Sequence, residues 1–189
     1  MKDTKSKNHL GGYRVGGDPD TWYPELWSWL VREKGVDTVL DVGCGEGLTV
    51  DYFNNMGCNA WGIEGLEQSH PRIIQHDFTL GKTDLCNEQY DLVWSCEFVE
   101  HVEEKYMENF LDAFRRGDLV LMTHAMPGQR GHHHVNCQEQ SYWVDVMESI
   151  GYKLDEEITE QTREIASYNR SKSNYYKKSG LAFIKGINT

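Results

Sequence analysis

Two short segments carry most of the side chains in this chain that could do chemistry. The first, residues 95–102, reads Ser-Cys-Glu-Phe-Val-Glu-His-Val and places Glu97 and Glu100 just ahead of His101. If that stretch forms a helical turn, these three side chains lie on one face. The second, residues 127–136, reads Pro-Gly-Gln-Arg-Gly-His-His-His-Val-Asn and adds three consecutive imidazoles. Together the two segments offer ligands for a metal or groups for proton transfer.

Three hypotheses fit these residues. In the first, Glu97, Glu100, His101 and one histidine of the triplet bind Mg²⁺, Mn²⁺, Fe²⁺ or Zn²⁺, which accept mixed oxygen and nitrogen ligands. The metal would lower the pKa of a bound hydroxyl and fix its geometry. In the second, His101 or His134 is a general base, because an ordinary imidazole pKa of about 6.5 suits proton abstraction. In the third, Glu97 touches a cofactor, Glu100 and His101 cap a helix, and the triplet is an exposed loop.

A glycine-rich segment lies earlier in the chain and reads Val-Leu-Asp-Val-Gly-Cys-Gly-Glu-Gly over residues 39–47. An apolar run leads into its glycines, which allow a tight turn and let a ligand lie against bare backbone. The dinucleotide fingerprint would require a further glycine where Leu48 stands. Asp41 beside the loop favours a cationic ligand, since it would repel a pyrophosphate. A nicotinamide-dependent oxidoreductase is therefore disfavoured.

Apolar runs and helical patterns alternate along the chain and must position these segments. The expected strands are residues 36–42, 60–63, 72–75, 90–95, 119–123, 152–154 and 181–184, and the expected helices are residues 21–34, 48–56, 103–114 and 140–150. This alternation predicts an α/β fold with a doubly wound, mostly parallel seven-stranded sheet. Ligands of such sheets bind at the carboxyl ends of the strands, where both chemical segments and the glycines fall.

The glycine segment closely resembles motif I of the class I methyltransferases that use S-adenosylmethionine (SAM), and the resemblance continues across about residues 36–185. It implies a Rossmann-like fold, SAM as the cofactor and methyl transfer as the activity. Glu64, which ends the second strand, would hold the ribose hydroxyls. Asp77 would meet the adenine amino group, and Phe78 would lie against the ring. The residues that the resemblance assigns to SAM are Asp41, Gly43, Cys44, Gly45, Glu64, Asp77, Phe78 and Ser95.

The Glu-x-x-Glu-His spacing also resembles metal-assisted O-methyltransferases, namely the small-RNA 2′-O-methyltransferases and those of the ubiquinone pathway. By position, His134 best matches the later histidine of that pattern. The resemblance thus implies Glu97, Glu100, His101 and His134 as metal ligands. Many ubiquinone-like methyltransferases carry a similar stretch without requiring a metal, so all three hypotheses stand.

Composition and charge limit the choice of acceptor. The chain has 189 residues, enough for one domain, and a net charge of −11, which disfavours nucleic acid as a substrate. We therefore expect O-methylation of a small metabolite or sugar-like acceptor, with RNA 2′-O-methylation or a catalytically silent SAM-binding module as alternatives.

No apolar run suits a signal peptide or membrane span, and the odd number of scattered cysteines indicates reduced thiols, so a cytoplasmic protein is expected. The cysteines are Cys44, Cys58, Cys86, Cys96 and Cys137.

Two segments are candidates for lids over the site. Residues 1–20 form an N-terminal arm before the SAM-binding domain, residues 21–189; we expect an unstructured tail over residues 1–10 and a glycine-hinged lid over residues 11–17. A second lid is expected at residues 156–180, between the last two strands. Its side chains that would suit a polar acceptor are Arg163, Tyr168, Tyr175 and Tyr176.

Overall fold

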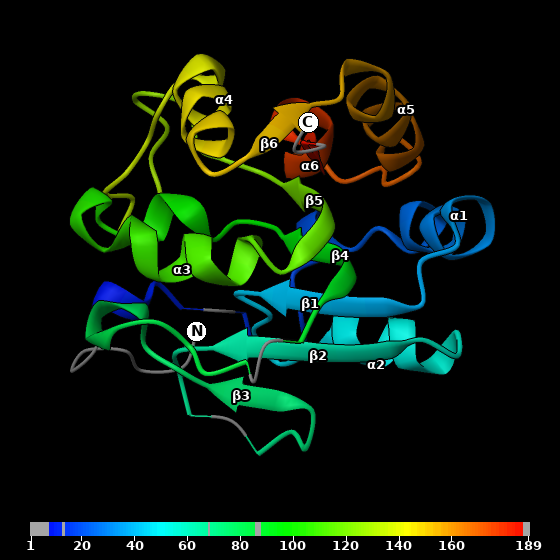
Figure 1. Ribbon diagram of the computed structural model, residues 1–189, viewed down its shortest axis with the longest axis horizontal. Coiled ribbons are helices and arrows are strands. Elements are labelled where there is room, and N and C mark those ends of the chain that lie inside the picture. Colours follow the sequence, from blue (N-terminus) through cyan, green and yellow to red (C-terminus); the bar gives the residue numbers. More distant parts are fainter. Residues whose placement is uncertain (1–7, 13, 68, 86–87, 187–189) are drawn as a thin grey trace.

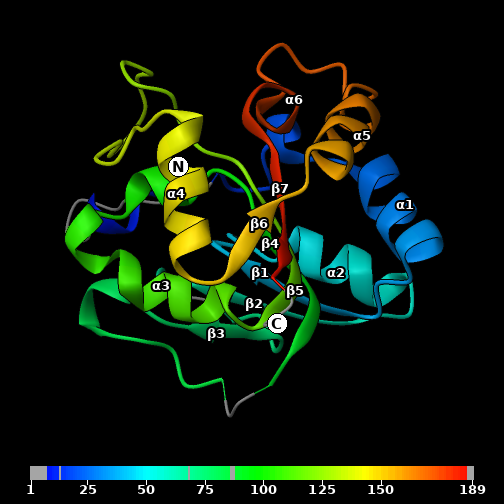
Figure 2. The same cartoon turned by 45° about the horizontal axis from the view of Figure 1, so that its top comes forward.

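The computed structural model describes residues 8–12, 14–67, 69–85 and 88–186, and within them seven strands form one sheet (Figure 1). Their order across the sheet is β3-β2-β1-β4-β5-β7-β6, and the five strands β1 to β5 are parallel. β7 runs antiparallel to both β5 and β6, and β6 is the edge strand on this side of the sheet (Figure 2). The predicted doubly wound, mostly parallel sheet is confirmed. The strands are β1 (Thr38–Val42), β2 (Asn59–Glu64), β3 (Ile73–Gln75), β4 (Tyr90–Ser95), β5 (Gly117–Met122), β6 (Tyr152–Leu154) and β7 (Leu181–Lys185).

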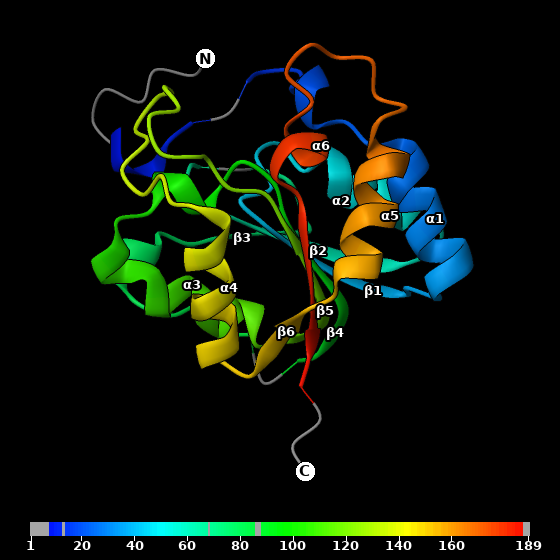
Figure 3. The same ribbon diagram turned by 90° about the horizontal axis from the view of Figure 1, so that it is seen from above.

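Helices cover both faces of the sheet, as Figure 3 shows from above. α3 and α4 bury Phe110 and Trp143 against one face, whereas α1 and α2 bury Trp27 and Phe53 against the other. These four side chains are fully buried in close-packed cores, so the sheet is a rigid support for the loops at its ends. The helices are α1 (Pro24–Lys34), α2 (Leu48–Asn55), α3 (Met107–Phe114), α4 (Gln140–Ser149), α5 (Glu156–Ala166) and α6 (Tyr175–Ser179).

Asp91 secures the alignment of β1 beside β4. Its carboxylate accepts hydrogen bonds from the backbone N–H groups of Asp37 and Thr38, at 2.9 and 2.8 Å, and from the Thr38 hydroxyl at 2.9 Å. The two strands therefore start in a set register and end together at the edge where the glycine segment and the Glu-x-x-Glu-His segment begin.

The segment expected as a second lid, residues 156–180, contains α5 and α6. α5 begins at the N-cap Asp155, whose carboxylate accepts a hydrogen bond from the backbone N–H of Ile158 at 2.8 Å. Its buried face is made of Thr159, Thr162 and Ala166, residues too small or polar to form a clear apolar pattern. The spacing of apolar residues therefore did not predict this helix.

Tyr176 of α6 lies in the core and cannot contact an acceptor. It is fully buried and stacks on Trp94, with ring centroids 5.1 Å apart and an interplanar angle of 13°. Arg163 donates to the carbonyl oxygen of Gly180 at 2.6 Å. Of the four side chains expected to face an acceptor, only Tyr175 lines the cavity at the carboxyl ends of the parallel strands.

Two helix boundaries also differ from the prediction. α1 begins at Pro24 rather than at Thr21, because proline occupies the first helical position, and Trp22 therefore lies outside the helix. The helix expected over residues 103–114 is divided into a 3₁₀ turn, Glu104–Tyr106, and α3.

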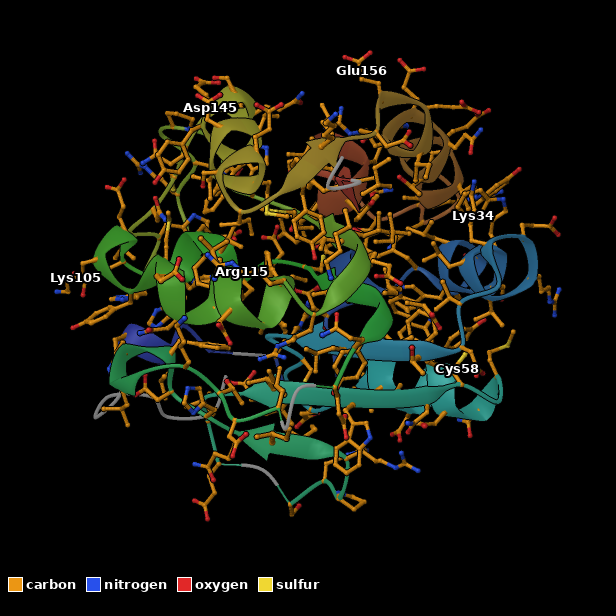
Figure 4. All side chains as sticks on the ribbon, in the orientation of Figure 1. Lys34, Cys58, Lys105, Arg115, Asp145 and Glu156 are labelled. Atoms are coloured by element: carbon orange, nitrogen blue, oxygen red, sulfur yellow. The ribbon has the colours of Figure 1, made fainter. Side chains whose placement is uncertain are left out.

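Charged side chains such as Lys34, Lys105, Asp145 and Glu156 project outward around the periphery (Figure 4). Among the described residues no helix is both long and apolar enough to cross a membrane. The four described cysteines are free thiols, as expected, whereas Cys86 lies outside the described residues.

Candidate active site

A cavity of about 350 Å³ opens at the carboxyl ends of the parallel strands. Its walls are the glycine loop after β1, the end of β2 and the segments after β3, β4 and β5. His9, Leu10, Gly12 and part of the stretch 14–22 also line it, and Figure 3 shows the blue N-terminal segment and the yellow-green loop after β5 at the same end of the sheet. The segments singled out by their chemistry therefore meet around one space, as expected for an α/β sheet.

The glycine loop forms the floor of this cavity. Gly43, Gly45 and Gly47 have φ angles of 84°, 55° and 83°, in the left-handed region that favours glycine. A Cβ on Gly43 would lie 2.6 Å from the Phe98 ring, so this position also lacks room for a side chain. The loop therefore presents bare backbone to a ligand, as the sequence pattern predicted.

Glu64 joins the glycine loop to β2. Its carboxylate accepts hydrogen bonds from the backbone N–H groups of Gly45 and Leu66, both at 3.0 Å, and the residue lines the cavity. Burial raises the pKa of this carboxyl, and the backbone hydrogen bonds only partly oppose that effect. Glu64 thus shapes the loop and also offers oxygen atoms to hydroxyl groups of a ligand.

We expect Glu64→Ala to weaken binding of S-adenosylhomocysteine (SAH) by about 1–3 kcal/mol, the scale for losing charged hydrogen bonds. Calorimetric titration measures the change. Glu67→Ala is the matched control, because Glu67 is exposed and does not line the cavity, and its affinity should equal that of the wild type. Equal affinities for all three proteins would contradict a role for Glu64.

Asp41 is a buried acid that faces the cavity, with 3% of its surface exposed. Burial raises its pKa from 3.8 to about 8, although a hydrogen bond with Thr49 opposes the shift. A carboxyl held in this environment is stabilised in its charged form by a nearby cation. The site therefore favours a cationic ligand, as the sequence indicated.

The raised pKa of Asp41 predicts a stability that depends on pH. Between about pH 4 and pH 8 the folded ligand-free protein binds a proton at Asp41 that the unfolded chain has lost, so the free energy of unfolding falls as pH rises. Each pKa unit corresponds to about 1.4 kcal/mol. Urea unfolding at pH 5 and pH 8 should show a smaller pH dependence in Asp41→Asn than in the wild type. The exposed Asp145→Asn variant should behave as the wild type does.

Asp77 and Phe78 lie beside each other on the cavity wall. Asp77 caps a 3₁₀ turn, Phe78–Leu80, by accepting hydrogen bonds from the Thr79 backbone at 2.9 Å and hydroxyl at 2.7 Å. Its other oxygen lies 2.7 Å from Nε2 of His9. Residues 8–10 form a 3₁₀ turn beside the cavity, which corrects the tail expected there, whereas residues 1–7 lie outside the described residues.

Ser95 does not line the cavity. Its hydroxyl donates to the carbonyl oxygen of Val42 at 3.0 Å, which ties β4 to β1. We therefore leave Ser95 out of the candidate cofactor site. The other cofactor residues suggested by the sequence all line the cavity: Asp41, Gly43, Cys44, Gly45, Glu64, Asp77 and Phe78.

The acids and histidines after β4 divide into two groups. Glu97 has a φ of 56°, in the left-handed region, and precedes a 3₁₀ turn, Val99–His101. Thr123 holds it, since the threonine hydroxyl accepts from the Glu97 backbone N–H at 2.7 Å. Glu97 therefore precedes the turn that carries Glu100 and His101, and the helical turn expected over all three residues begins only at Val99. Among the described residues, Glu100, His101 and His134 form the group whose ligand atoms all lie within 4.8 Å of one another.

Glu100 is fully buried, and neither of its carboxylate oxygens has a hydrogen-bond partner among the described residues. Its backbone carbonyl accepts from the N–H groups of Val135 and Asn136, which brings the loop after β5 against the 3₁₀ turn. Burial raises the pKa of Glu100 well above its usual range. A buried carboxylate without donors is costly, so this geometry calls for a partner of positive charge.

The imidazoles beside Glu100 could bind the same cation as its carboxylate. Burial and the neighbouring His134 lower the pKa of His101 to about 4, so its ring is neutral at physiological pH. The His101 and His134 ring centroids are 5.0 Å apart, and Nδ1 of His101 has no partner among the described residues. Nδ1 of His134 lies 3.1 Å from the carbonyl oxygen of Gln129, a contact that fixes the ring orientation.

Several cavity residues lie in segments that the sequence singled out but were given no individual role. His9 and Asp18 come from the N-terminal segment, and Arg130 and His133 come from the loop after β5. The paired glycines at residues 11–12 and 16–17 gave a signal for a folded arm, but the partners of the individual side chains lie far away in the chain. Tyr13, within the expected lid, lies outside the described residues.

Comparison with known proteins agrees with this architecture. The sequence profile of the methyltransferase domain family matches residues 17–161, so the chain belongs to that family. No curated protein matches the chain in sequence.

Solved structures share the class I SAM-dependent methyltransferase fold. The 1,6-didemethyltoxoflavin N1-methyltransferase of Burkholderia thailandensis, with bound 1,6-didemethyltoxoflavin and SAH, has a TM-score of 0.62 at 12% identity, covering 93% of this chain and 84% of that one. The magnesium protoporphyrin IX methyltransferase of Synechocystis PCC 6803, with bound SAM, has 0.60 at 14%, covering 97% and 90%. The methyltransferase domain of bacterial CtHen1-C has 0.56 at 17%, covering 90% and 100%.

Proposed function

We propose that this protein uses SAM to methylate a hydroxyl group of a small acceptor, and that Glu100, His101 and His134 bind a divalent cation beside that hydroxyl. The family membership and the fold support methyl transfer. Structural neighbours with bound SAM or SAH support the cofactor. The observation that carries the cation site is the buried carboxylate of Glu100, unpartnered among the described residues beside two imidazoles.

The cofactor fits the acidic floor of the cavity. SAM carries a positively charged sulfonium, which buried Asp41 would stabilise, and Glu64 would accept hydrogen bonds from the ribose hydroxyls. Asp77 and Phe78 would hold the adenine, as the sequence resemblance implies. These residues orient the donor, and orientation of two reactants can lower a barrier by about 7–11 kcal/mol.

The ligand chemistry fits Mg²⁺, Mn²⁺, Fe²⁺ or Zn²⁺, because one carboxylate and two imidazoles form a mixed oxygen and nitrogen set. A bound cation would lower the pKa of the acceptor hydroxyl. The residues of this chain hold the acceptor side in place. Gly11 closes over the site, since a Cβ there would lie 3.1 Å from the His101 ring, and the N-terminal segment thereby limits access of water.

A purely general-base role for His101 is less well supported. The best general base has a pKa near the operating pH, whereas burial lowers the pKa of His101 to about 4. His134 is the candidate base for a reaction without metal. The net charge of −11 weighs against RNA as the acceptor, and a catalytically silent SAM-binding module would show no turnover in any condition.

Calorimetric titration with SAH, with and without EDTA, alongside elemental analysis of the purified protein, tests the proposal. We expect micromolar SAH binding, a stoichiometric divalent metal, and methyl transfer that EDTA suppresses and added Mn²⁺ or Mg²⁺ restores. SAH binding with no metal requirement would transfer the proton step to His134. A protein that does not bind SAH would contradict the proposed function.

A further inference from the structure

The two sides of the cavity differ in charge. Acidic residues gather on the side built from the glycine loop and the end of β2, where Asp41, Glu46 and Glu64 line the wall. On the opposite side, the stretch from His124 to Gln138 contains no aspartate or glutamate. This stretch carries Arg130 and four histidines, and we call it the basic wall. Its lack of acids contrasts with the net charge of −11 of the whole chain.

Two side chains of this basic wall are available to a ligand. Arg130 is exposed at the cavity, and among the described residues it has no carboxylate partner. His133 has a φ of 53°, in the left-handed region, and its buried Nε2 has no hydrogen-bond partner among those residues. Strained backbone and an unpartnered buried nitrogen commonly mark a place where a ligand binds.

Three other titratable groups that line the cavity already have partners. His9 contacts Asp77 at 2.7 Å, and Arg14 lies 3.7 Å from Asp18. Glu103, the acid closest in sequence to the cation site on this side, pairs with Lys105 at 2.7 Å. Glu97 and Glu103, the acids that line the cavity from the segment after β4, form no ion pair with Arg130 among the described residues.

We propose that the acceptor carries an anionic group, a carboxylate or a phosphate, that Arg130 and His133 bind beside the reacting hydroxyl. A guanidinium forms a planar fork that matches either anion with two parallel hydrogen bonds, and an imidazole N–H adds a third. The arrangement orients the molecule: its anion lies on the basic wall, and the hydroxyl faces the acidic floor where the cationic cofactor lies. This inference rests on the proposed function and narrows its substrate class.

Three probes that share one diol ring test this inference: neutral catechol, 3,4-dihydroxybenzoate and 3,4-dihydroxybenzylphosphonate. Their affinities are measured by calorimetry with the SAH-loaded protein in Mg²⁺. The diol is common to all three probes, and the change in the preference for an anionic probe between the wild type and Arg130→Gln isolates the contribution of the anion at this wall. We expect at least one anionic probe to bind about tenfold tighter than catechol, and the tighter of the two distinguishes carboxylate from phosphate.

Arg130→Gln should remove that preference, His133→Gln should reduce it, and the exposed Arg32→Gln, on α1 away from the cavity, should retain it. Equal affinities for neutral and anionic probes, or a preference that survives Arg130→Gln, would overturn the inference alone. A wild-type protein that fails to bind SAH would overturn the proposed function and this inference with it.

Discussion

Replacing Glu100 by glutamine is expected to abolish metal binding and to lower methyl transfer at least about 100-fold, while SAH binding changes little. Glu100 supplies the only carboxylate among the clustered ligands of the described chain, and it is fully buried. Even outer-shell partners of a metal typically contribute about 10–100-fold to affinity or activity, so a direct ligand should matter more. Elemental analysis, SAH calorimetry and turnover with added Mn²⁺ measure the three quantities.

The stability of Glu100→Gln separates a metal ligand from a structural residue. In metal-free protein the wild-type carboxylate is buried without donors among the described residues, so the neutral amide should leave the unfolding temperature unchanged or raise it. Added metal should then stabilise the wild type but not the variant. Glu148→Gln, an exposed change on α4, serves as the control. A variant that keeps its metal and its turnover would reject Glu100 as a ligand.

Replacing Gly45 by valine is expected to weaken SAH binding about 100-fold or more. Gly45 has a φ of 55°, which a β-branched residue adopts only at a cost of about 1–3 kcal/mol. Its N–H donates to Glu64, so a displaced loop would also lose a charge-assisted hydrogen bond of about 1.5–3 kcal/mol. The strain is relieved only if the loop moves, and a displaced loop no longer presents its backbone to SAH; the expected 100-fold loss of affinity corresponds to about 2.7 kcal/mol.

Gly35→Val is the matched control for Gly45→Val. Gly35 has a φ of 70°, and a Cβ there would meet no atom within 4 Å. The control therefore suffers similar backbone strain at the C-cap of α1, away from the cavity. We expect both variants to unfold at a lower temperature and only Gly45→Val to lose SAH. If both variants bound SAH as the wild type does, the cofactor would lie elsewhere.

The parts of the fold that local sequence specifies were predictable. β4 covers Tyr90–Ser95, as predicted, because a continuous apolar run is typical of a strand buried on both faces. The glycine loop was predictable for a similar reason: left-handed backbone requires glycine, and the requirement is visible at each position. α5 escaped prediction, since threonine and alanine form its buried face.

The sequence by itself determined the sheet, the glycine floor of the cavity and the meeting of the two chemical segments above neighbouring strands, because periodicity and glycine spacing act through nearby residues. Only the tertiary structure decided which side chains face one another. It left Glu97 outside the cluster of Glu100, His101 and His134, and it brought His134 against His101 from the loop after β5. It also placed His9 on Asp77, 68 residues away. Such contacts depend on how distant elements pack, which no local pattern records.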